Sequence, residues 1–510
     1  MLTLVIMLES GIVLGVEKMI AFYIPGLLGD ILIGIFIIFT ILNLIVAFNI
    51  IFIKDRSTSS TWAWLFILFI APVLGFFLYI FFGRGVSKRK LYKHYRKDIE
   101  QFDDIINEQR YQVQEGKIQS ENPVVNQHHD LVNMLLTRQP AFLTDGNDAD
   151  IFVDGHELYD KMIEDIRQAK HHIHLEYYVF ELDGLGHRII DALEERLEAG
   201  VEVLLLYDDI GSKKLTMRQF KRFRSLGGQV EAFFANKLPL VNFRINNRNH
   251  RKIVVIDGQI GYVGGFNVGD DYLGLNKKFG YWRDTHVRVE GKAVDALQLR
   301  FMLDWNSQSK RERLEYLPEY FPVKEENGDV AMQIASSGPD DNWHEIEFGY
   351  TKMINSAEKS IYMQSPYFIP DNSYINALKM AANSGVDVHL MIPDMPDHPF
   401  VYWATFYHAA ELIDSGVKIY MYNNGFIHSK MMVVDDQVAS VGSANMDFRS
   451  FELNFEINAF MYNEDIAVQL REAFEHDVTL STQLTAARYE ERSFWIKMKE
   501  GFSKLITPIL

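Results

Sequence analysis

A polar signature occurs twice in this 510-residue chain, and it limits the folds that the chain can adopt. The first copy, NHRKIVVIDGQIGYVGGFN, covers residues 249–267, and the second, IHSKMMVVDDQVASVGSAN, covers residues 427–445. The five residue types His, Lys, Asp, Gly and Asn recur at the same offsets: His250, Lys252, Asp257, Gly264 and Asn267, then His428, Lys430, Asp435, Gly442 and Asn445. Repetition on this scale predicts two similar structural units in one chain.

The elements around the signature are duplicated as well. Strand, helix and strand patterns follow one another at residues 170–180, 186–200 and 201–209, and again at 358–370, 372–385 and 386–394. Each helical pattern ends at a glycine, as is common at helix C-termini. We therefore predict an α/β fold with two halves related by a pseudo-twofold axis, residues 130–310 and 330–485, which together form one catalytic body.

Two stretches near the N-terminus, residues 31–53 and 61–82, contain no charged residue. A membrane-spanning helix needs about 20 apolar residues, so each stretch is long enough to span, and a buried core helix of this length would rarely lack a charge. We predict a membrane region over residues 1–83, with the two spans forming a transmembrane helical hairpin. Residues 1–30 are apolar but carry charges, and the sequence leaves open whether they form another span or lie in the interface.

The orientation in the membrane follows from the cations that flank the second span. The run GRGVSKRKLYKHYRK, residues 83–97, contains no acidic residue, whereas the connection between the spans is short and mixed in charge. The positive-inside rule predicts a multi-pass membrane protein with a cytoplasmic catalytic body. The same cations would contact anionic lipids. We interpret residues 84–129 as a juxtamembrane helix and linker, and residues 486–510 as an amphipathic tail that either lies on the membrane or packs against the domain.

Composition excludes several kinds of site. The chain has no cysteine, which removes disulfides and thiolate metal ligands. Its net charge of −17 argues against a protein that coats nucleic acid.

The signature itself predicts a phosphoryl-transfer site. His and Lys at positions i and i+2 of a strand point to the same face, so each half presents one imidazole and one ammonium group together. With two halves facing each other, one histidine can attack phosphorus while the other protonates the leaving oxygen, and the lysines stabilise the phosphoryl oxygens without a metal or cofactor. We assign the catalytic residues as His250, Lys252, Asp257, His428, Lys430 and Asp435, and the substrate-binding amides as Asn267 and Asn445.

An attacking imidazole needs an orienting carboxylate. Asp284, in YWRDTHVRV, follows His250, and Glu456, in LNFEINAF, follows His428 at a comparable place. We expect Asp284 to orient His250 and Glu456 to orient His428. The alternative is that both carboxylates are ordinary surface residues of strands.

The duplicated H-x-K-x4-D-x6-G-[GS]-x-N pattern resembles the motif of the phospholipase D superfamily. Together with the apolar N-terminus and the segments GYWRDTH, LQLRFMLDWN and QSPYFIPD, the chain resembles the bacterial cardiolipin synthases over nearly its whole length. The resemblance implies that two phosphatidylglycerol molecules give cardiolipin and glycerol through a phosphatidyl-histidine intermediate, without a metal.

Other functions use the same residues. A phospholipase D-type hydrolase would transfer the phosphatidyl group to water, and a phosphatidylserine synthase of the same superfamily would transfer it to serine. A nuclease would also cleave a phosphodiester, but the acidic charge and the apolar segments disfavour it, and an inert scaffold would not need two intact motifs. The symmetric motif does not identify the attacking histidine, although family precedent favours His250. The oligomeric state and the acyl-chain preference also stay open.

Overall fold

The computed structural model describes residues 26–53, 58–83, 91–92, 97, 99–115, 120–138, 141–235, 246–309, 313–325, 327–340 and 343–506. The chain divides into an N-terminal helical unit and a larger catalytic body that begins at Ser87. Each unit is described by itself. Most of residues 1–30 and most of the basic run at 84–97 fall outside the described residues, and so do the predictions made for them.

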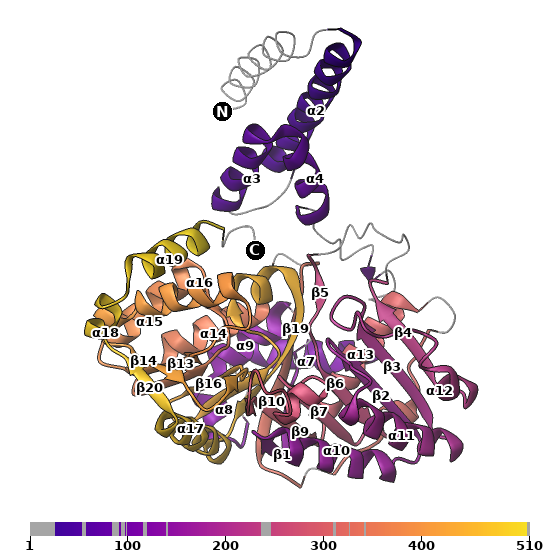
Figure 1. The fold of residues 1–510 in the computed structure, drawn as a ribbon. Coiled ribbons are helices and arrows are strands. Elements are labelled where there is room, and N and C mark those ends of the chain that lie inside the picture. The colour runs from indigo at the N-terminus through magenta and orange to yellow at the C-terminus, as the bar shows by residue number, and fades with distance from the viewer. Residues whose placement is uncertain are drawn as a thin grey trace. The chain divides into compact units, whose positions relative to one another are not determined.

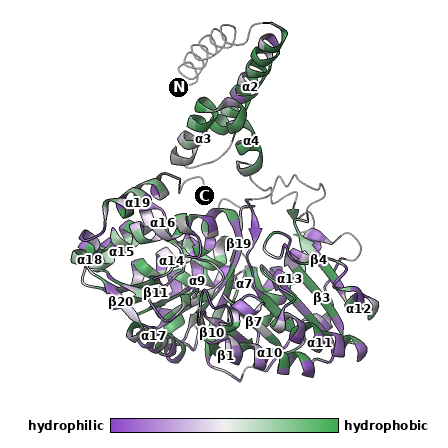
Figure 2. Cartoon of the chain, in the orientation of Figure 1, coloured by the Kyte–Doolittle hydropathy of each residue, from purple (hydrophilic) through white to green (hydrophobic). Residues whose placement is uncertain are grey.

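One long apolar helix dominates the N-terminal unit. Helix α2, Leu27–Phe52, has a mean hydropathy of 2.9 over its most apolar window, and it is the one helix among the described residues that is long and apolar enough to cross a membrane. Figure 2 shows its strongly hydrophobic character, which α3 and α4 share. The first expected span, residues 31–53, is therefore confirmed as a helix of spanning length.

The second expected span, residues 61–82, is wrong as a continuous helix. The chain instead forms two short helices, α3 (Thr58–Ile70) and α4 (Pro72–Phe82), with a break at Ala71. Proline at the first position of α4 explains the break, because its ring disfavours helical backbone at the preceding residue. The two helices fold back on each other, and the rings of Trp64 and Tyr79 meet at 5.4 Å.

Asn43 of α2 stabilises this fold-back. Its side chain is fully buried, and its amide donates to the carbonyls of Leu68 at 3.2 Å and of Pro72 at 3.0 Å. These carbonyls flank the break, where helical hydrogen bonds are interrupted and polar backbone atoms need partners. Gly75 permits the close approach of α4 to α3, since a Cβ at this position would lie 2.7 Å from the carbonyl oxygen of Ile67.

The catalytic body is built on one continuous 16-stranded sheet with helices on its faces (Figure 1). Fifteen strands follow the order β20-β14-β13-β11-β16-β17-β19-β10-β1-β9-β7-β6-β2-β3-β4, and the sixteenth, β5 (Arg248–Asn249), pairs with β19 off this path. The strands of the first half are β1 (Leu143–Phe152), β2 (His172–Tyr177), β3 (Glu202–Asp208), β4 (Gln229–Phe233), β6 (Ile253–Ile256), β7 (Ile260–Gly264) and β9 (His286–Glu290). Those of the second half are β10 (Val330–Ser337), β11 (Ser360–Gln364), β13 (Asp387–Pro393), β14 (Lys418–Tyr422), β16 (Met431–Val434), β17 (Val438–Gly442), β19 (Asn454–Tyr462) and β20 (Ser481–Leu484).

The predicted two-half α/β architecture is confirmed. The strand order β4-β3-β2-β6-β7-β9-β1 repeats as β14-β13-β11-β16-β17-β19-β10, with parallel pairing up to β2 or β11 and antiparallel pairing from there on. Antiparallel pairing of β1 with β10 joins the two halves. The helices α11 (Gly184–Glu198) and α15 (Asn372–Asn383) occupy the segments predicted to be helical.

Helices complete two hydrophobic cores, one for each half. The remaining helices are α7 (Asp103–Gln114), α8 (Pro123–Gln127), α9 (His129–Arg138), α10 (Gly155–Gln168), α12 (Lys221–Ser225), α13 (Ala293–Gln308), α14 (Glu345–Ser356), α16 (Pro399–Ala410), α17 (Glu464–Thr479), α18 (Ala486–Glu490) and α19 (Phe494–Ile506). Although α8 and α9 precede the first half in the sequence, their apolar residues pack into the core of the second half.

Two-residue strand pairs cross between the halves and position the signature. Strand β5 (Arg248–Asn249) pairs in parallel with the start of β19, and β15 (Phe426–Ile427) pairs in parallel with β8 (Trp282–Arg283). A third short pair, β12 (Phe368–Ile369) with β18 (Met446–Asp447), lies within the second half. Each copy of the signature therefore begins beside a strand of the other half.

Candidate active site

The two copies of the signature meet at the carboxyl ends of the parallel strands. His250 and Lys252 lie between β5 and β6, and His428 and Lys430 lie between β15 and β16. The end of an open α/β sheet formed by the carboxyl ends of its strands is where such folds usually bind ligands. All four side chains are at least nine-tenths buried. The predicted union of both His/Lys pairs in one site is present in the structure.

Each histidine contacts the carboxylate of the opposite half. His250 Nδ1 lies 2.9 Å from Glu456 Oε2, and His428 Nδ1 lies 2.6 Å from Asp284 Oδ2. The expected pairs, His250 with Asp284 and His428 with Glu456, are therefore wrong, although all four residues belong to the site.

The crossed strand pairs explain the exchange. The backbone N–H of His250 donates to the carbonyl of Phe455 at 2.9 Å, next to Glu456, and that of His428 donates to the carbonyl of Arg283 at 2.7 Å, next to Asp284. Spacing along the chain contains no sign of this exchange, because both arrangements use the same residues.

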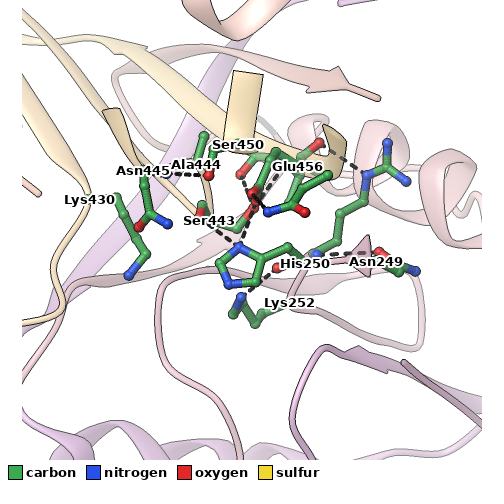
Figure 3. A network of polar contacts seen from close by, with 12 residues as sticks. Asn249, His250, Lys252, Lys430, Ser443, Ala444, Asn445, Ser450 and Glu456 are labelled. Atoms are coloured by element: carbon green, nitrogen blue, oxygen red, sulfur yellow. Dashed lines mark hydrogen bonds and ion pairs between the residues drawn. The ribbon is translucent and has the colours of Figure 1, made fainter. Parts of the chain in front are cut away.

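The neighbours of His250 determine which ring nitrogen carries its proton. Nδ1 faces two acceptors, the carboxylate of Glu456 and the backbone carbonyl of Ser443 at 3.1 Å (Figure 3). Nδ1 must therefore be the N–H donor, which leaves a lone pair on Nε2. His428 differs, because its Nδ1 faces the carboxylate of Asp284 and also the ammonium of Lys430 at 2.8 Å.

Serine and glycine mark a second difference between the halves. The Ser443 hydroxyl donates to Glu456 Oε2 at 2.5 Å. The matching residue, Gly265, leaves no room for a side chain, since a Cβ there would lie 2.0 Å from Asp284 Oδ1. The two carboxylates are thus held by different donors; Asp284 instead accepts the N–H of Thr285 at 2.8 Å.

Burial controls the protonation of the basic groups. It lowers the pKa of Lys252 to about 7 and that of Lys430 to about 8. Burial, helped by the charge of Lys430, also lowers the pKa of His428 to about 4. The pKa of His250 is lowered by burial too, although Glu456 acts in the opposite direction. Without substrate, both imidazoles are therefore neutral near pH 7.

The two carboxylates stay ionised in spite of their burial. Burial acts to raise the pKa of Asp284, but Lys430 and His428 lower it more, so the net shift is downward. Glu456 behaves in the same way, with His250 and Lys252 as the neighbours that lower its pKa. Hydrogen bonds and opposite charge favour the charged form of a buried acid.

The signature aspartates lie away from this centre, which corrects their assignment as catalytic residues. Asp257 accepts the backbone N–H groups of Lys170, His171 and His172 at 2.7–3.0 Å. Asp435 accepts the equivalent groups of Glu358, Lys359 and Ser360 at 2.7–2.8 Å. Both residues have positive φ, 53° and 56°, in the turns of the β6–β7 and β16–β17 hairpins. They tie these turns to the starts of β2 and β11, at the opposite ends of β6 and β16 from the histidines.

The two asparagines are buried, and they differ in their contacts. Asn267 Oδ1 accepts the N–H of Val179 at 3.1 Å, and its carbonyl accepts the hydroxyl of Tyr159 at 2.5 Å. Asn445 Oδ1 has no hydrogen-bond partner among the described residues, and Figure 3 shows its side chain beside Lys430. A ligand contact is therefore better supported for Asn445 than for Asn267.

Two buried arginines, absent from the sequence assignment, hold the backbone of the catalytic carboxylates. Arg251 Nε donates to the carbonyl of Glu456 at 3.1 Å, and Arg251 pairs with Asp304 of α13 at 2.8 Å. Arg283 donates to the carbonyl of Asp284 at 2.5 Å and pairs with Asp477 of α17 at 2.9 Å. An acidic residue within an otherwise apolar helix segment, such as Asp304 in FMLDW (301–305), was the available signal for such a partner.

Aromatic rings line the two histidines differently. The ring of Tyr178 lies 4.7 Å from that of His250, and Lys252 Nζ lies 5.4 Å from the same tyrosine ring. Beside His428 the neighbour is Trp282, at 5.1 Å. The arrangement as a whole brings together two imidazoles, one of them with a lone pair on Nε2, and two lysines whose positive charge suits an anionic phosphodiester.

Comparison with known protein families agrees with this chemistry. The family described as "Cardiolipin synthase, PLD-like domain" matches residues 162–299 and 350–478. The family described as "Phospholipase_D-nuclease N-terminal" matches residues 41–84.

Curated proteins match over almost the full chain. Cardiolipin synthase 1 of Staphylococcus epidermidis is 62% identical over 488 residues, which cover 95% of this chain and 99% of that protein. Cardiolipin synthase 1 of Staphylococcus aureus is 62% identical over 473 residues, 92% of this chain and 96% of that protein. Among solved structures, phosphatidylserine synthase of Haemophilus influenzae matches with a TM-score of 0.56 at 16% identity, covering 71% of this chain and 95% of that one, and this likeness concerns the fold alone.

Proposed function

Because the chain belongs to the cardiolipin synthases, phosphatidyltransferases of the phospholipase D superfamily, we propose that His250 and His428 share one transfer of a phosphatidyl group between two phosphatidylglycerol molecules. His250 is the nucleophile in this proposal, and His428 is the general acid and then the general base.

The observation that carries the assignment is the pair of acceptors on His250 Nδ1. Since the Glu456 carboxylate and the Ser443 carbonyl both require a proton there, Nε2 is held as the lone-pair nitrogen. His428 Nδ1 meets one acceptor and one donor, which fixes its tautomer less strictly and suits a residue that gains and loses a proton.

In the first step His250 Nε2 attacks phosphorus of one phosphatidylglycerol. The bond from phosphorus to the headgroup oxygen breaks, and His428 gives its proton to the departing glycerol. In the second step the free primary hydroxyl of another phosphatidylglycerol attacks the phosphatidyl-histidine, His428 takes the hydroxyl proton, and the bond from phosphorus to His250 breaks. The products are cardiolipin and glycerol, and both histidines return to their starting states.

Binding of the anionic substrate favours the protonated form of His428. Near pH 7 His428 is neutral without substrate, because burial and Lys430 lower its pKa. An anionic phosphodiester bound among Lys252, Lys430 and His428 offsets this cationic field and favours the imidazolium form. The lysines then stabilise the charge on the phosphoryl oxygens in the transition state.

The lipid substrate and the apolar helix support a membrane protein in preference to a nucleic-acid enzyme. We propose that α2 anchors the chain in a bacterial cell membrane and that the catalytic body lies on the cytoplasmic side, as the basic run at residues 83–97 predicts. The membrane region then contains one spanning helix and a short helical hairpin within the described residues, not two spans.

Product analysis and adduct mapping test the proposal. Full-length protein in detergent, given pure phosphatidylglycerol, should release cardiolipin and glycerol; phosphatidic acid as the main product would indicate a hydrolase instead. With a phosphodiester whose leaving group needs no proton, the His428→Ala variant should accumulate a covalent adduct that maps to His250. A label on His428 would reverse the two roles.

A further inference from the structure

The last helix of the catalytic body has its hydrophobic face on the outside. Four large apolar residues of α19 are more than half exposed: Phe494 (68%), Trp495 (73%), Met498 (53%) and Phe502 (55%). Their spacing of four residues from 494 to 502, with Trp495 beside them, places them on one side of the helix. A core helix would show the reverse arrangement.

Polar residues occupy the side of α19 that faces the protein. Glu500 and Ser503 are 2% and 1% exposed. Glu500 Oε2 accepts from Arg492 Nε at 3.1 Å and from the hydroxyl of Tyr489 at 3.2 Å. The helix is thus attached to the body by polar contacts, and its apolar side stays available for another environment.

Helix α16 extends the apolar surface, and lysines border it. Phe400 of α16 is 52% exposed, and its ring lies 6.0 Å from that of Phe502. Lys499 and Lys504, both exposed, lie over the rings of Trp403 and Tyr407 of α16 at 5.1 Å and 4.4 Å. We call the four apolar residues of α19 together with Phe400 the α19 face.

We propose that the α19 face docks into the interfacial region of a bilayer that contains anionic lipid. Helices of this kind combine an apolar side that includes Trp or Phe with flanking lysines that attract anionic headgroups. A second copy of this chain is the less suitable occupant, because protein interfaces are depleted in lysine.

The position of the α19 face fits a role in substrate access. Figure 1 shows α16 and α19 at the same end of the catalytic body as β5, the strand that leads into His250. Docking there would hold the end of the body that contains β5 close to the lipid headgroups. This docking surface goes beyond the phosphatidyl transfer proposed above, and it does not depend on which histidine attacks.

Fluorescence in lipid vesicles tests the docking directly. The chain has no cysteine, so a single cysteine can be placed at Met498 (Met498→Cys) in full-length protein and carry an environment-sensitive fluorophore. Val323→Cys is the matched control: Val323 is 97% exposed, and its carbonyl accepts from Gln259 at the β6–β7 turn, at the other end of β6 from Lys252. In vesicles of phosphatidylcholine and phosphatidylglycerol, nitroxide-labelled lipids should quench the label at position 498 at least about threefold more than the one at 323.

A second readout distinguishes docking from catalysis. Trp495→Glu should lower activity on phosphatidylglycerol in vesicles about tenfold or more, because it removes an apolar anchor and adds a negative charge. Its activity on a short-chain phosphodiester dispersed in detergent should stay within about twofold of the unchanged protein.

Three outcomes would overturn the proposal. They are equal quenching at positions 498 and 323, energy transfer between 498 labels that depends on protein concentration and indicates a second copy, or equal loss of activity on both substrates. Failure of Trp495→Glu to fold leaves the quenching comparison as the deciding test. The chemistry of the proposed function could fail in its own tests without changing any of these results.

Discussion

At the scale of single residues, the carboxylate beside each imidazole determines how a substitution there should behave. Because Glu456 contacts His250, Glu456→Gln should slow adduct formation, by about 10²–10⁴-fold as for other orienting carboxylates. Because Asp284 contacts His428, Asp284→Asn should still form the adduct from a substrate with an activated leaving group, and should stall afterwards. Stopped-flow measurement of adduct formation and decay checks both, and the opposite assignment would show that the crossed contacts are not those of the working enzyme.

With a phosphodiester whose leaving group needs no proton, so that His428 is not required as an acid, the lowered pKa values predict an unusual pH profile for kcat/KM. His250 must be neutral to attack, and because burial lowers its pKa, the acidic limb should lie below pH 6.5. The lysines must be charged to bind the phosphodiester, and their pKa values of about 7 and 8 place the loss of activity on the alkaline side near these values, well below 10.5. Lys252→Arg provides the control, since Lys252 has the lower of the two pKa values and arginine keeps its charge, so the alkaline limb should move upward in a folded variant.

At the scale of elements, the signature aspartates should act on stability. In Asp435→Asn, an amide NH₂ replaces one carboxylate oxygen among three backbone donors, which should lower the free energy of unfolding by about 1–3 kcal/mol. Asp436→Asn is the matched control: the residue has the same φ of 56°, and its carboxylate makes a surface pair with Arg471. Thermal unfolding together with adduct formation per folded molecule separates the effects, and a large catalytic loss at unchanged stability would restore a chemical role for Asp435.

The α3–α4 hairpin predicts a specific membrane topology. If the chain folds back at Ala71, the start of α3 and the end of α4 reach the same membrane surface, whereas two spans would separate them. Single cysteines from Thr61→Cys and Lys97→Cys should therefore react with a membrane-impermeant maleimide from the same side, and Gly26→Cys from the other. Reaction of Lys97→Cys together with Gly26→Cys, with Thr61→Cys reacting from the other side, would indicate a continuous second span. Asn43→Leu should weaken the fold-back, since the carbonyls of Leu68 and Pro72 lose their donor.

At the scale of the whole molecule, one chain contains both halves of the site. Mixing His250→Ala protein with His428→Ala protein should therefore restore no activity, because neither chain can lend an intact half to the other without exchanging its strands. The assay is cardiolipin formation after co-reconstitution, with co-expression of the same pair as a second arm. Recovered activity would reveal sites shared between chains.

The sequence predicts the architecture well because the architecture repeats. Two matched sets of strand and helix patterns predicted the halves, and matched His/Lys pairs predicted the common centre. What the sequence could not predict depends on contacts between the halves. Asp284 and Glu456 lie at comparable spacings in either arrangement, and only the crossed pairing of β5 with β19 and β15 with β8 decides which histidine each one meets.

Two further errors have local causes. Asp257 and Asp435 recur with the histidines because the same turn occurs in both halves and requires the same residue in each. Repetition alone therefore does not distinguish a catalytic residue from one that stabilises a turn. The second apolar stretch is long enough to span, but Pro72 interrupts it, and hydropathy averaged over a window does not register a single proline.

The unequal pair Gly265 and Ser443 has an evolutionary consequence. In a symmetric assembly of two identical subunits, one gene encodes both sides of the site, so every substitution appears on both sides at once. Here each side has its own codons. The Glu456 carboxylate accepts a hydrogen bond from the Ser443 hydroxyl, whereas the Asp284 carboxylate lies against Gly265, which has no side chain. With both halves in one chain, attack and proton transfer can therefore be adjusted separately, whereas in a homodimer each substitution would change both.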